Sequence, residues 1–270
     1  MKKIILSSLF LLLLSGCNLV QIVPPEKNQG IDESALINNA NLNNELNINQ
    51  SINGTAEAKL TCQGQSITET TKAYTISANY PECDLADAQK KKTLNEKIKG
   101  TITAVINSFK DDLNSPDFSQ LPNLTSTFNS DYTISYADPN LISLSFIIET
   151  YYSGAAHPNQ DVAVVNYDLQ KMAIISLADI FKPDTKYLDK LSVICQTTFN
   201  AKFKNDVWFS EGCTPEDNFS EFVITNTGLK FLFPPYQVAP YSAGMQEIDV
   251  NYSDLNDFIN KNSVLAEIIK

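Results

Sequence analysis

The pattern of apolar and polar positions along the chain predicts two amphipathic helices. In the first, over residues 85–113, apolar side chains recur at near-helical spacing and the lysines at 90–92 fall on the solvated side. The second helix is predicted over residues 184–204. The positions expected to face inward are Leu94, Ile98, Ile102, Val105 and Phe109 in the first helix, and Leu188, Leu191, Ile194, Phe199 and Phe203 in the second.

Period-two alternation predicts strands before, between and after these helices. Asp138-Pro139-Asn140 marks one turn, and Ser253-Asp254 is expected to cap a closing helix that begins near Leu255. The expected strands cover residues 55–62, 68–80, 125–136, 141–152, 162–169, 173–177 and 245–252, with a hairpin over 219–233 that turns at 226–228. Helices and strands come in separate runs. This arrangement predicts an α+β fold, with antiparallel sheets and two main helices packed against them.

The first residues have the pattern of an export signal. Lys2 and Lys3 precede an apolar run, residues 4–14, that is shorter than the about 20 residues needed to span a bilayer. The run ends in Leu14-Ser15-Gly16-Cys17, which resembles the lipobox of bacterial lipoprotein precursors. The resemblance implies cleavage before Cys17, acylation of this residue (palmitate included), and the lipid bilayer as a partner. An ordinary secretory signal with a chance cysteine is the alternative.

Composition divides the chain into four parts. Residues 1–16 are the expected signal peptide, and residues 17–54 carry the lipidated cysteine and a tether with nine asparagines within 28–53. A segment of this kind buries too little apolar area to offset its ordering entropy. We expect residues 55–125 to form an N-terminal α+β module with the long helix. Residues 126–270 are expected to form a C-terminal α+β module, packed with the first as one unit.

The acidic charge balance limits the kind of partner. The chain has 31 acidic and 20 basic residues, a formal net charge of −11, and removal of the two signal lysines leaves −13. Such a surface excludes nucleic acid, which needs a basic footprint, and attracts cationic proteins. Solubility alone is the alternative explanation. Asn18 follows the lipidated cysteine, which by the lipoprotein resemblance implies the outer membrane, facing the periplasm or the surface, in a cell with two membranes.

Four cysteines remain besides the lipidation site. Cys62 and Cys83 lie 21 residues apart, and Cys195 and Cys213 lie 18 apart. Outside the cytoplasm an even number of cysteines predicts disulfides, and four cysteines allow three connectivities. We favour the two local pairs, because they lie at opposite ends of the chain. A zinc site is the competing interpretation, but CxxC spacing is absent.

No motif for a specific chemistry is present. The sequence has no phosphate loop, dinucleotide fingerprint, GxSxG elbow or metal motif, and His157 is the only histidine. His157 lies in a small-residue turn between strands, where a lone histidine more often holds a loop by hydrogen bonds than acts in catalysis. We therefore expect no metal and no cofactor.

Three segments carry a family resemblance. Tyr151–Asn159 resembles the GGAH turn of the extracytoplasmic domain of RsiV-type anti-sigma factors, which is also found beside peptidoglycan deacetylases and in lipoproteins of unassigned function. Asn166–Leu169 with Ile175–Phe181 is similar to the NYDL…ISLxDIF stretch of that family. Residues 233–252 resemble its PYxxAPYxAG signature and the Ile-x-Val-x-Tyr ending. Two departures, Ala155 and Met172, replace glycines that tolerate positive φ, so these turns are expected to differ in shape.

The resemblance implies binding and not catalysis. In the anti-sigma factors this domain is a lysozyme receptor, and in the deacetylases the chemistry belongs to a separate domain. We therefore expect a membrane-anchored envelope lipoprotein that is not an enzyme and that binds lysozyme, another cationic envelope protein or peptidoglycan. The candidate partner-binding residues are Tyr152, His157, Pro235, Tyr236, Pro240 and Tyr241. The alternatives are a peptidoglycan- or glycan-processing enzyme or accessory, and a structural envelope lipoprotein.

Overall fold

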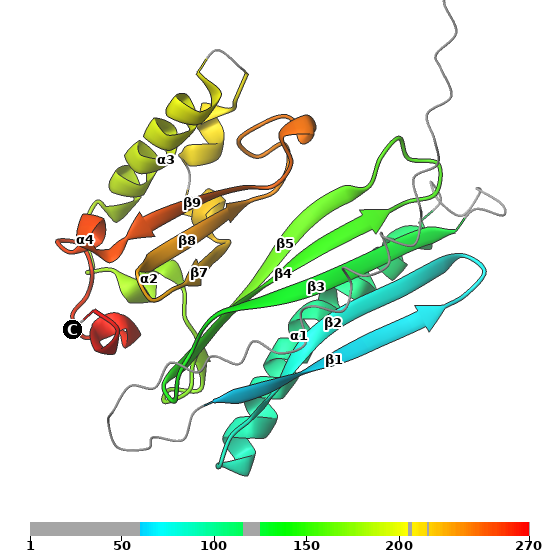
Figure 1. The fold of residues 1–270 in the computed structure, drawn as a ribbon, viewed down its shortest axis with the longest axis horizontal. Helices are drawn as coiled ribbons and strands as arrows, with labels where there is room; N and C mark the ends of the chain where they lie inside the picture. Colours follow the sequence, from blue (N-terminus) through cyan, green and yellow to red (C-terminus); the bar gives the residue numbers. More distant parts are fainter. Residues whose placement is uncertain (1–59, 116–124, 205–206, 215, 270) are drawn as a thin grey trace, which may run out of the picture. The chain divides into compact units, whose positions relative to one another are not determined.

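Two β-sheets, each packed against one main helix, make up the part of the chain that the computed structural model describes (Figure 1). The described residues are 60–115, 125–204, 207–214 and 216–269. The predicted signal peptide, the lipidation site at Cys17, the tether and the start of the first expected strand lie outside them. None of the described helices is long and apolar enough to cross a bilayer.

The larger sheet has six strands and contains one parallel pair. Its strands follow the order β1 to β6, and all neighbours are antiparallel except β2 and β3. The connection between the parallel strands is the long helix α1, because parallel neighbours need a crossover of this kind. The bounds are Thr61–Thr70 for β1, Tyr74–Asp84 for β2, Ala88–Leu113 for α1, Ser126–Ala137 for β3, Leu141–Tyr151 for β4, Asn159–Asp168 for β5 and Ala173–Ile174 for β6.

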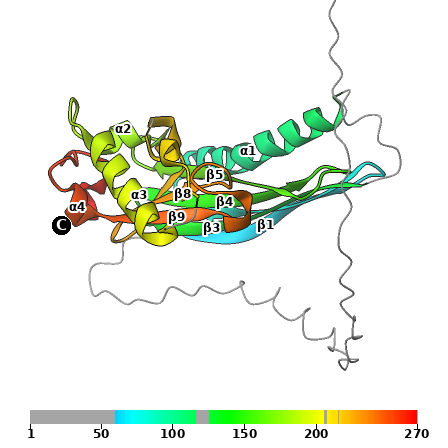
Figure 2. The same ribbon diagram turned by 90° about the horizontal axis from the view of Figure 1, so that it is seen from above.

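Helix α1 lies on one face of this sheet, as the second view also shows (Figure 2). Asp87 is its N-cap and accepts hydrogen bonds from the backbone of Gln89 and Lys90, so the helix begins three residues later than predicted. Four of the five expected inward positions are buried, but Ile106 is buried where Val105 was expected. Lys90 was predicted on the solvated side of the helix, but its Nζ donates a hydrogen bond to the backbone oxygen of Leu169 at 2.8 Å.

The first hairpin differs from the prediction. The expected break between residues 62 and 68 lies inside β1, and the turn falls at residues 71–73. Gly64, inside the expected break, pairs with Pro81 within the ladder, where a Cβ would lie 3.3 Å from the Tyr132 hydroxyl. The real turn is held by Thr71, whose Oγ1 accepts hydrogen bonds from the backbone of Ala73 and Tyr74.

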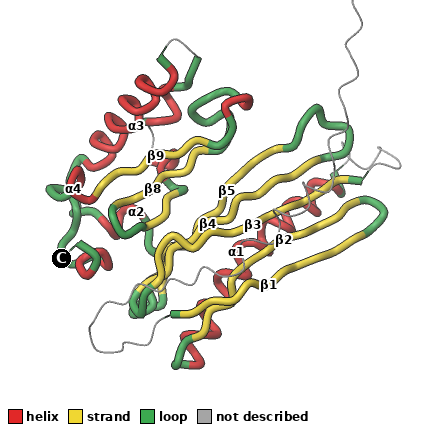
Figure 3. Tube along the Cα trace, viewed as in Figure 1, coloured by secondary structure: helices red, strands yellow, loops and turns green. Residues whose placement is uncertain are grey.

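The smaller sheet contains three antiparallel strands in the order β7, β8, β9, with helix α3 packed against it. Figure 3 distinguishes these strands from the helices and loops around them. Leu191, Cys195 and Phe199 of α3 are buried, while Leu188, Ile194 and Phe203 are partly buried. The bounds are Leu177–Ile180 for α2, Tyr187–Phe203 for α3, Phe222–Ile224 for β7, Gly228–Phe233 for β8, Gln246–Asn251 for β9 and Tyr252–Leu255 for α4.

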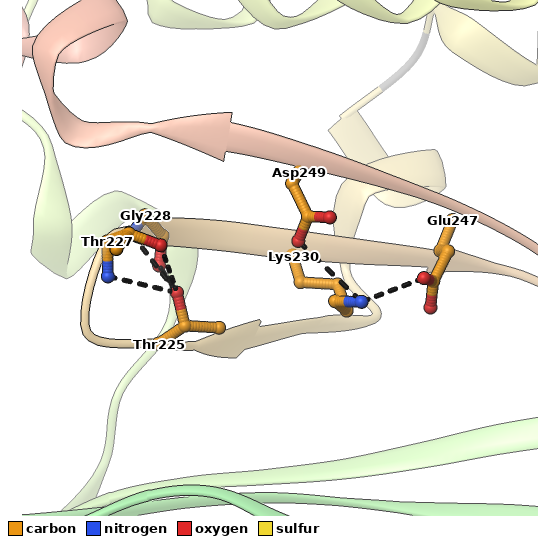
Figure 4. Close-up of polar contacts among 6 residues, drawn as sticks. All are labelled: Thr225, Thr227, Gly228, Lys230, Glu247 and Asp249. Atoms are coloured by element: carbon orange, nitrogen blue, oxygen red, sulfur yellow. Dashed lines mark hydrogen bonds and ion pairs between the residues drawn. The ribbon is translucent and has the colours of Figure 1, made fainter.

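The β7–β8 turn confirms the predicted hairpin and explains its glycine (Figure 4). Thr225 Oγ1 accepts hydrogen bonds from the backbone of Thr227 and Gly228 and donates one to the Gly228 oxygen. A Cβ on Gly228 would lie 2.1 Å from the Val250 oxygen, so this position tolerates no side chain. Further along β8, Lys230 Nζ lies 2.8 Å from a carboxylate oxygen of Glu247 on β9.

Buried side chains join the two sheets. Asn166 on β5 accepts a hydrogen bond from Ser143 Oγ on β4 at 2.6 Å, and its Nδ2 donates to the Phe222 oxygen on β7 at 2.8 Å. The backbone N–H of Ile224 donates to Ser143 Oγ at 2.7 Å. Asn166 and Ser143 are almost fully buried. These bonds satisfy polar groups at the β7 edge where water cannot reach them.

The predicted fold class is confirmed as α+β. The closing helix was placed wrongly, because α4 begins at Tyr252 and has Asn251, not Ser253 or Asp254, at its N-cap. The short helix α2 was not predicted; Ser176 and Asp179 form its capping box. The expected module boundary near residue 125 falls between α1 and β3, two elements that pack together in the larger core.

Candidate functional site

Three aromatic side chains from two distant loops meet at the surface, and we call His157, Tyr236 and Tyr241 the aromatic cluster. The rings of His157 and Tyr241 are stacked, with centroids 3.9 Å apart and an interplanar angle of 25°. The ring of Tyr236 lies 5.8 Å from that of Tyr241, and its hydroxyl lies 3.5 Å from His157 Nε2. His157 follows β4, whereas both tyrosines lie between β8 and β9.

Tyr236 is held in an unusual backbone conformation that exposes its side chain. Its φ is 72°, a left-handed value that costs a residue with a Cβ about 1–2 kcal/mol. The Tyr236 N–H donates to the Ala239 oxygen at 2.9 Å, which fixes this turn. Tyr236 is 56% exposed, and among the described tyrosines, phenylalanines and tryptophans it alone is classed as exposed. Strain kept at an exposed aromatic residue is a reason to consider a functional role.

The loop that carries Tyr236 rests on a buried support. Val238 and Ala239 are fully buried, and the Val238 oxygen accepts a hydrogen bond from the Phe209 N–H at 2.8 Å. Gly212 packs against the same loop, where a Cβ would lie 2.1 Å from the Gln237 oxygen. Backbone of the 209–213 segment therefore holds the loop in position.

His157 presents a hydrogen-bond acceptor toward Tyr236. Its Nδ1 lies 2.8 Å from the backbone oxygen of Pro158, and a carbonyl oxygen only accepts, so Nδ1 carries the proton of this bond. In the neutral imidazole Nε2 then accepts, and it faces the Tyr236 hydroxyl. The cluster thus offers an aromatic surface with a hydroxyl and an imidazole at its edge.

The other three candidate residues do not share this surface. Tyr152 lies against α1, where its hydroxyl donates to Asp112 at 2.6 Å and its ring lies 5.5 Å from Phe109. Pro235 is buried, and Pro240 is half-buried at the start of the short turn that holds Tyr241. The structure therefore brings together His157, Tyr236 and Tyr241 of the six predicted residues.

The two departures from the glycine pattern have different consequences. The positive φ in the first turn belongs to Gly154, at 90°, and Ala155 is not among the described residues with positive φ. Met172 does adopt the left-handed conformation that the missing glycine would take, with φ of 55°. The expectation of altered turn shape is therefore wrong for the backbone at Met172, which keeps the glycine-like conformation despite its side chain.

Glu221 is a buried carboxylate that the sequence did not reveal. Its Oε2 is buried and has no hydrogen-bond partner among the described residues. Burial raises the pKa of Glu221, the hydrogen bond from Ser220 opposes this, and the charge of Asp161 raises the pKa further. No local pattern marks Glu221, because Asp161, whose charge acts on it, lies 60 residues earlier in the chain.

We expect Glu221→Gln to stabilise the fold at neutral pH. A carboxyl whose pKa is raised in the folded state binds its proton more tightly there than in the unfolded chain. The stability of the wild type therefore falls as pH rises from the ordinary glutamate range through the raised pKa, and glutamine removes this loss. Thermal unfolding should give the variant the higher Tm at pH 7, with a smaller difference at pH 4. Glu82→Gln, at an exposed position, is the control, and a difference that is the same at both pH values would contradict the assignment.

Both disulfides connect the local pairs that we favoured from the sequence. Cys62 is bonded to Cys83 across β1 and β2, and Cys195 of α3 is bonded to Cys213. The second disulfide ends in the segment that supports the Tyr236 loop. In the described ranges no group of three His, Cys, Asp or Glu residues is arranged to hold a metal ion.

Two protein families match separate segments of the chain, and each segment contributes to the aromatic cluster. Residues 67–160 match the family described as deacetylase PdaC, and residues 178–253 match the protein family of unknown function DUF3298. His157 lies in the first segment, and both tyrosines of the aromatic cluster lie in the second. The cluster is therefore assembled from both matched segments.

One relative of this chain is named as an enzyme. The chain is 34% identical over 137 residues to the peptidoglycan-N-acetylmuramic acid deacetylase PdaC of Bacillus subtilis (strain 168), in a match that covers 49% of this chain and 29% of that protein. This similarity contradicts our expectation that the chain is not an enzyme. The chain spans less than a third of the length of that relative.

Two solved structures share the fold. A DUF3298 family member from Bacteroides fragilis NCTC 9343 has a TM-score of 0.58 at 18% identity and covers 77% of this chain and 97% of its own. A DUF3298 family protein from Pseudomonas aeruginosa PAO1 has a TM-score of 0.52 at 14% identity, with 75% and 94% covered. At such identities the likeness extends to the fold. The chain thus has a segment similar to PdaC and a segment similar to DUF3298 proteins, within a fold that both structures resemble.

Proposed function

We propose that this chain is a cell-envelope protein of peptidoglycan processing that contacts wall glycan through the aromatic cluster. The observation that carries the proposal is the exposed Tyr236, fixed beside His157 and Tyr241 where the PdaC-like and DUF3298-like segments meet. The similarity to a peptidoglycan deacetylase supports the substrate class.

The chemistry of the cluster suits an amino sugar. Sugar rings have apolar C–H faces that pack on the electron-rich faces of aromatic rings, and their hydroxyl and acetamide groups need hydrogen-bond partners at the edge. The face of Tyr236 offers the first, and the Tyr236 hydroxyl with His157 Nε2 offers the second.

An extracytoplasmic location agrees with the disulfides, because they persist in oxidising compartments, and with the similarity to a wall deacetylase. We further propose that acylated Cys17 anchors the chain in the membrane. Cells fed a labelled palmitate analogue should label the wild-type protein and leave Cys17→Ser unlabelled. Label that persists in the variant would contradict lipidation at this residue.

The test of glycan contact is binding to purified peptidoglycan. Tyr236→Ala is expected to lower the affinity about tenfold, since truncation of an exposed aromatic anchor removes on the order of 1–2 kcal/mol. Tyr236→Phe should keep most of the affinity, because the ring remains. Val193→Ala on α3, at a residue that is 61% exposed, is the control for loss of an apolar surface side chain. Equal binding by wild type and Tyr236→Ala would contradict the proposal. Deacetylation is measured separately, as the acetate released from peptidoglycan in the same samples.

Capture of a cationic protein such as lysozyme is the second candidate, and the observation that favours it is the formal net charge of −11. Charge steering would make this binding fall as ionic strength rises. Calorimetric titration with a C-type lysozyme at low and physiological salt distinguishes the two candidates. Saturating 1:1 heat that survives physiological salt and is lost in Tyr236→Ala would favour lysozyme over glycan.

A further inference from the structure

A groove between α1 and β2, remote in sequence from the aromatic cluster, has the features of a second ligand site. It measures about 450 Å³, and its lining includes Tyr80, Lys91, Lys92, Asn95 and Lys99. An adjoining hollow of about 260 Å³ shares Lys91 with it and adds amide side chains of β1, Gln63 and Gln65. Glu82 and Lys91 line both hollows.

The lysines of this groove stand out in an acidic chain. Five of the ten residues from 90 to 99 are lysines and one is glutamate, although acidic residues outnumber basic ones 31 to 20 overall. Lys90 is bound to the Leu169 oxygen, and Lys91 is paired with Asp84 at 2.9 Å. The remaining lysines of the lining, Lys92 and Lys99, lie at exposed positions seven residues apart, two helical turns along one face.

Lys92 and Lys99 make only weak contacts within the protein. Lys92 lies 3.8 Å from Glu96, and both side chains are about two-thirds exposed, so this pair contributes little. Lys99 Nζ lies 5.8 Å from the centroid of the Tyr80 ring. This geometry places a cation beside an aromatic face at the wall of the groove.

The floor of the groove is rigid. Asn95 binds the backbone of Cys83 through two hydrogen bonds, accepting from its N–H at 2.8 Å and donating to its oxygen at 2.9 Å. Cys83 is bonded in turn to Cys62. The amide and the disulfide fix α1 against the first hairpin, so a ligand would meet side chains that are already in place.

We propose that this groove binds a carboxylate-bearing N-acetylated sugar, with Lys92 and Lys99 on the carboxylate and the Tyr80 ring against the sugar face. The amides of Gln63 and Gln65 then serve its hydroxyl or acetamide groups. The proposal deepens and rests on the proposed function, because it names the kind of wall sugar that the PdaC-like segment recognises.

The charge of the lining argues for one carboxylate and against a polyanion. Three lysines and two glutamates line the larger hollow, a formal charge of +1, and Asp84 of the adjoining hollow brings the two together to zero before a ligand binds. Glu82 and Glu96 repel additional negative charges, which disfavours phosphate-rich polymers. A neutral sugar would leave Lys99 without a counter-charge.

The test is a titration of the full chain with a disaccharide of N-acetylglucosamine and N-acetylmuramic acid whose lactyl carboxylate is free. Affinity is expected to fall about tenfold or more in Lys99→Glu, since one contact is lost and a like charge is added. Lys97→Glu is the matched control, because Lys97 is exposed on the same helix but does not line the groove. Neutral chitobiose should bind at least about tenfold more weakly than the acidic disaccharide.

Amide chemical shifts separate this proposal from the proposed function. Shifts at residues 80–99 support the groove, and shifts confined to residues 236–244 overturn it while leaving glycan contact at the aromatic cluster intact. Shifts at 80–99 with none at 236–244 support the groove and count against the cluster. Three other results would overturn the groove as a site for an acidic sugar. These are an equal loss of affinity in Lys97→Glu and Lys99→Glu, equal binding of chitobiose and the acidic disaccharide, and tighter binding of an acidic tetrapeptide than of the disaccharide.

Discussion

Asn166→Leu is expected to lower the free energy of unfolding by about 3 kcal/mol, because it leaves the Phe222 oxygen without its buried donor and the Ser143 O–H without its buried acceptor. Leucine keeps the branched shape of asparagine, with two methyl groups in place of the amide oxygen and nitrogen, so the loss would come mainly from the broken hydrogen bonds. Since the same amide joins β5 to β7, the variant should loosen the contact between the two sheets.

Urea unfolding measures this loss with two probes. Trp208, the only tryptophan in the sequence, lies 6.1 Å from Phe199 and reports on the core of the smaller sheet. Far-ultraviolet circular dichroism reports on both sheets. Asn129→Leu, at an exposed position on β3, is the control and should change stability by less than about 0.5 kcal/mol. A variant at Asn166 as stable as this control would show that the bridge contributes nothing.

The second large effect is expected from the Cys195–Cys213 disulfide. Replacing both cysteines with alanine should cost about 3 kcal/mol for a closed loop of 18 residues, and lower Tm by about 6–12 °C. It should also weaken peptidoglycan binding at temperatures where the variant is folded. Cys213 ends the segment whose backbone holds Val238 and Gln237, and these residues position Tyr236.

The Cys62–Cys83 disulfide provides the matched control. Its sequence separation of 21 is similar, so its removal should lower stability by a comparable amount. It lies in the first hairpin, away from the aromatic cluster, and supports the floor of the groove proposed above, so it is a control for stability and not for affinity. Differential scanning calorimetry gives both stability losses, and peptidoglycan sedimentation gives the affinity of the Cys195/Cys213 double variant. Wild-type affinity in that variant, at a temperature where it is folded, would contradict the role of Cys213 in positioning the Tyr236 loop.

Local patterns were sufficient to predict the two long helices, α1 and α3, and most strands. The apolar stripe of α1 is visible in the spacing of Leu94, Ile98 and Ile102, which lie close together in the sequence, so no tertiary contact is needed to predict it. The first hairpin was misplaced because Gly64 has the local pattern of a turn, whereas its pairing with Pro81 depends on a strand further along the chain. The parallel contact of β2 with β3 joins residues about 50 apart, and no local pattern encodes it.

The candidate site was predictable residue by residue but not as an assembly. His157 and the tyrosines of the second loop were identified from their motifs, and the stacking of His157 on Tyr241 was not. Tyr152 has the same kind of motif, yet its hydroxyl is bound to Asp112 of α1. The raised pKa of Glu221 was not predictable, because it depends on burial in the folded chain and on Asp161, a residue distant in the sequence.

The hydrogen bond from the Ile224 N–H to Ser143 Oγ and the stacking of His157 on Tyr241 both join the PdaC-like part to the DUF3298-like part. Natural recombination or laboratory chimeras that exchange one part for that of a distant relative would break both junctions. Changes at Ser143 or His157 therefore have to be matched in the second part. The two parts are therefore expected to be inherited together, and the contacting positions at the two junctions are expected to coevolve.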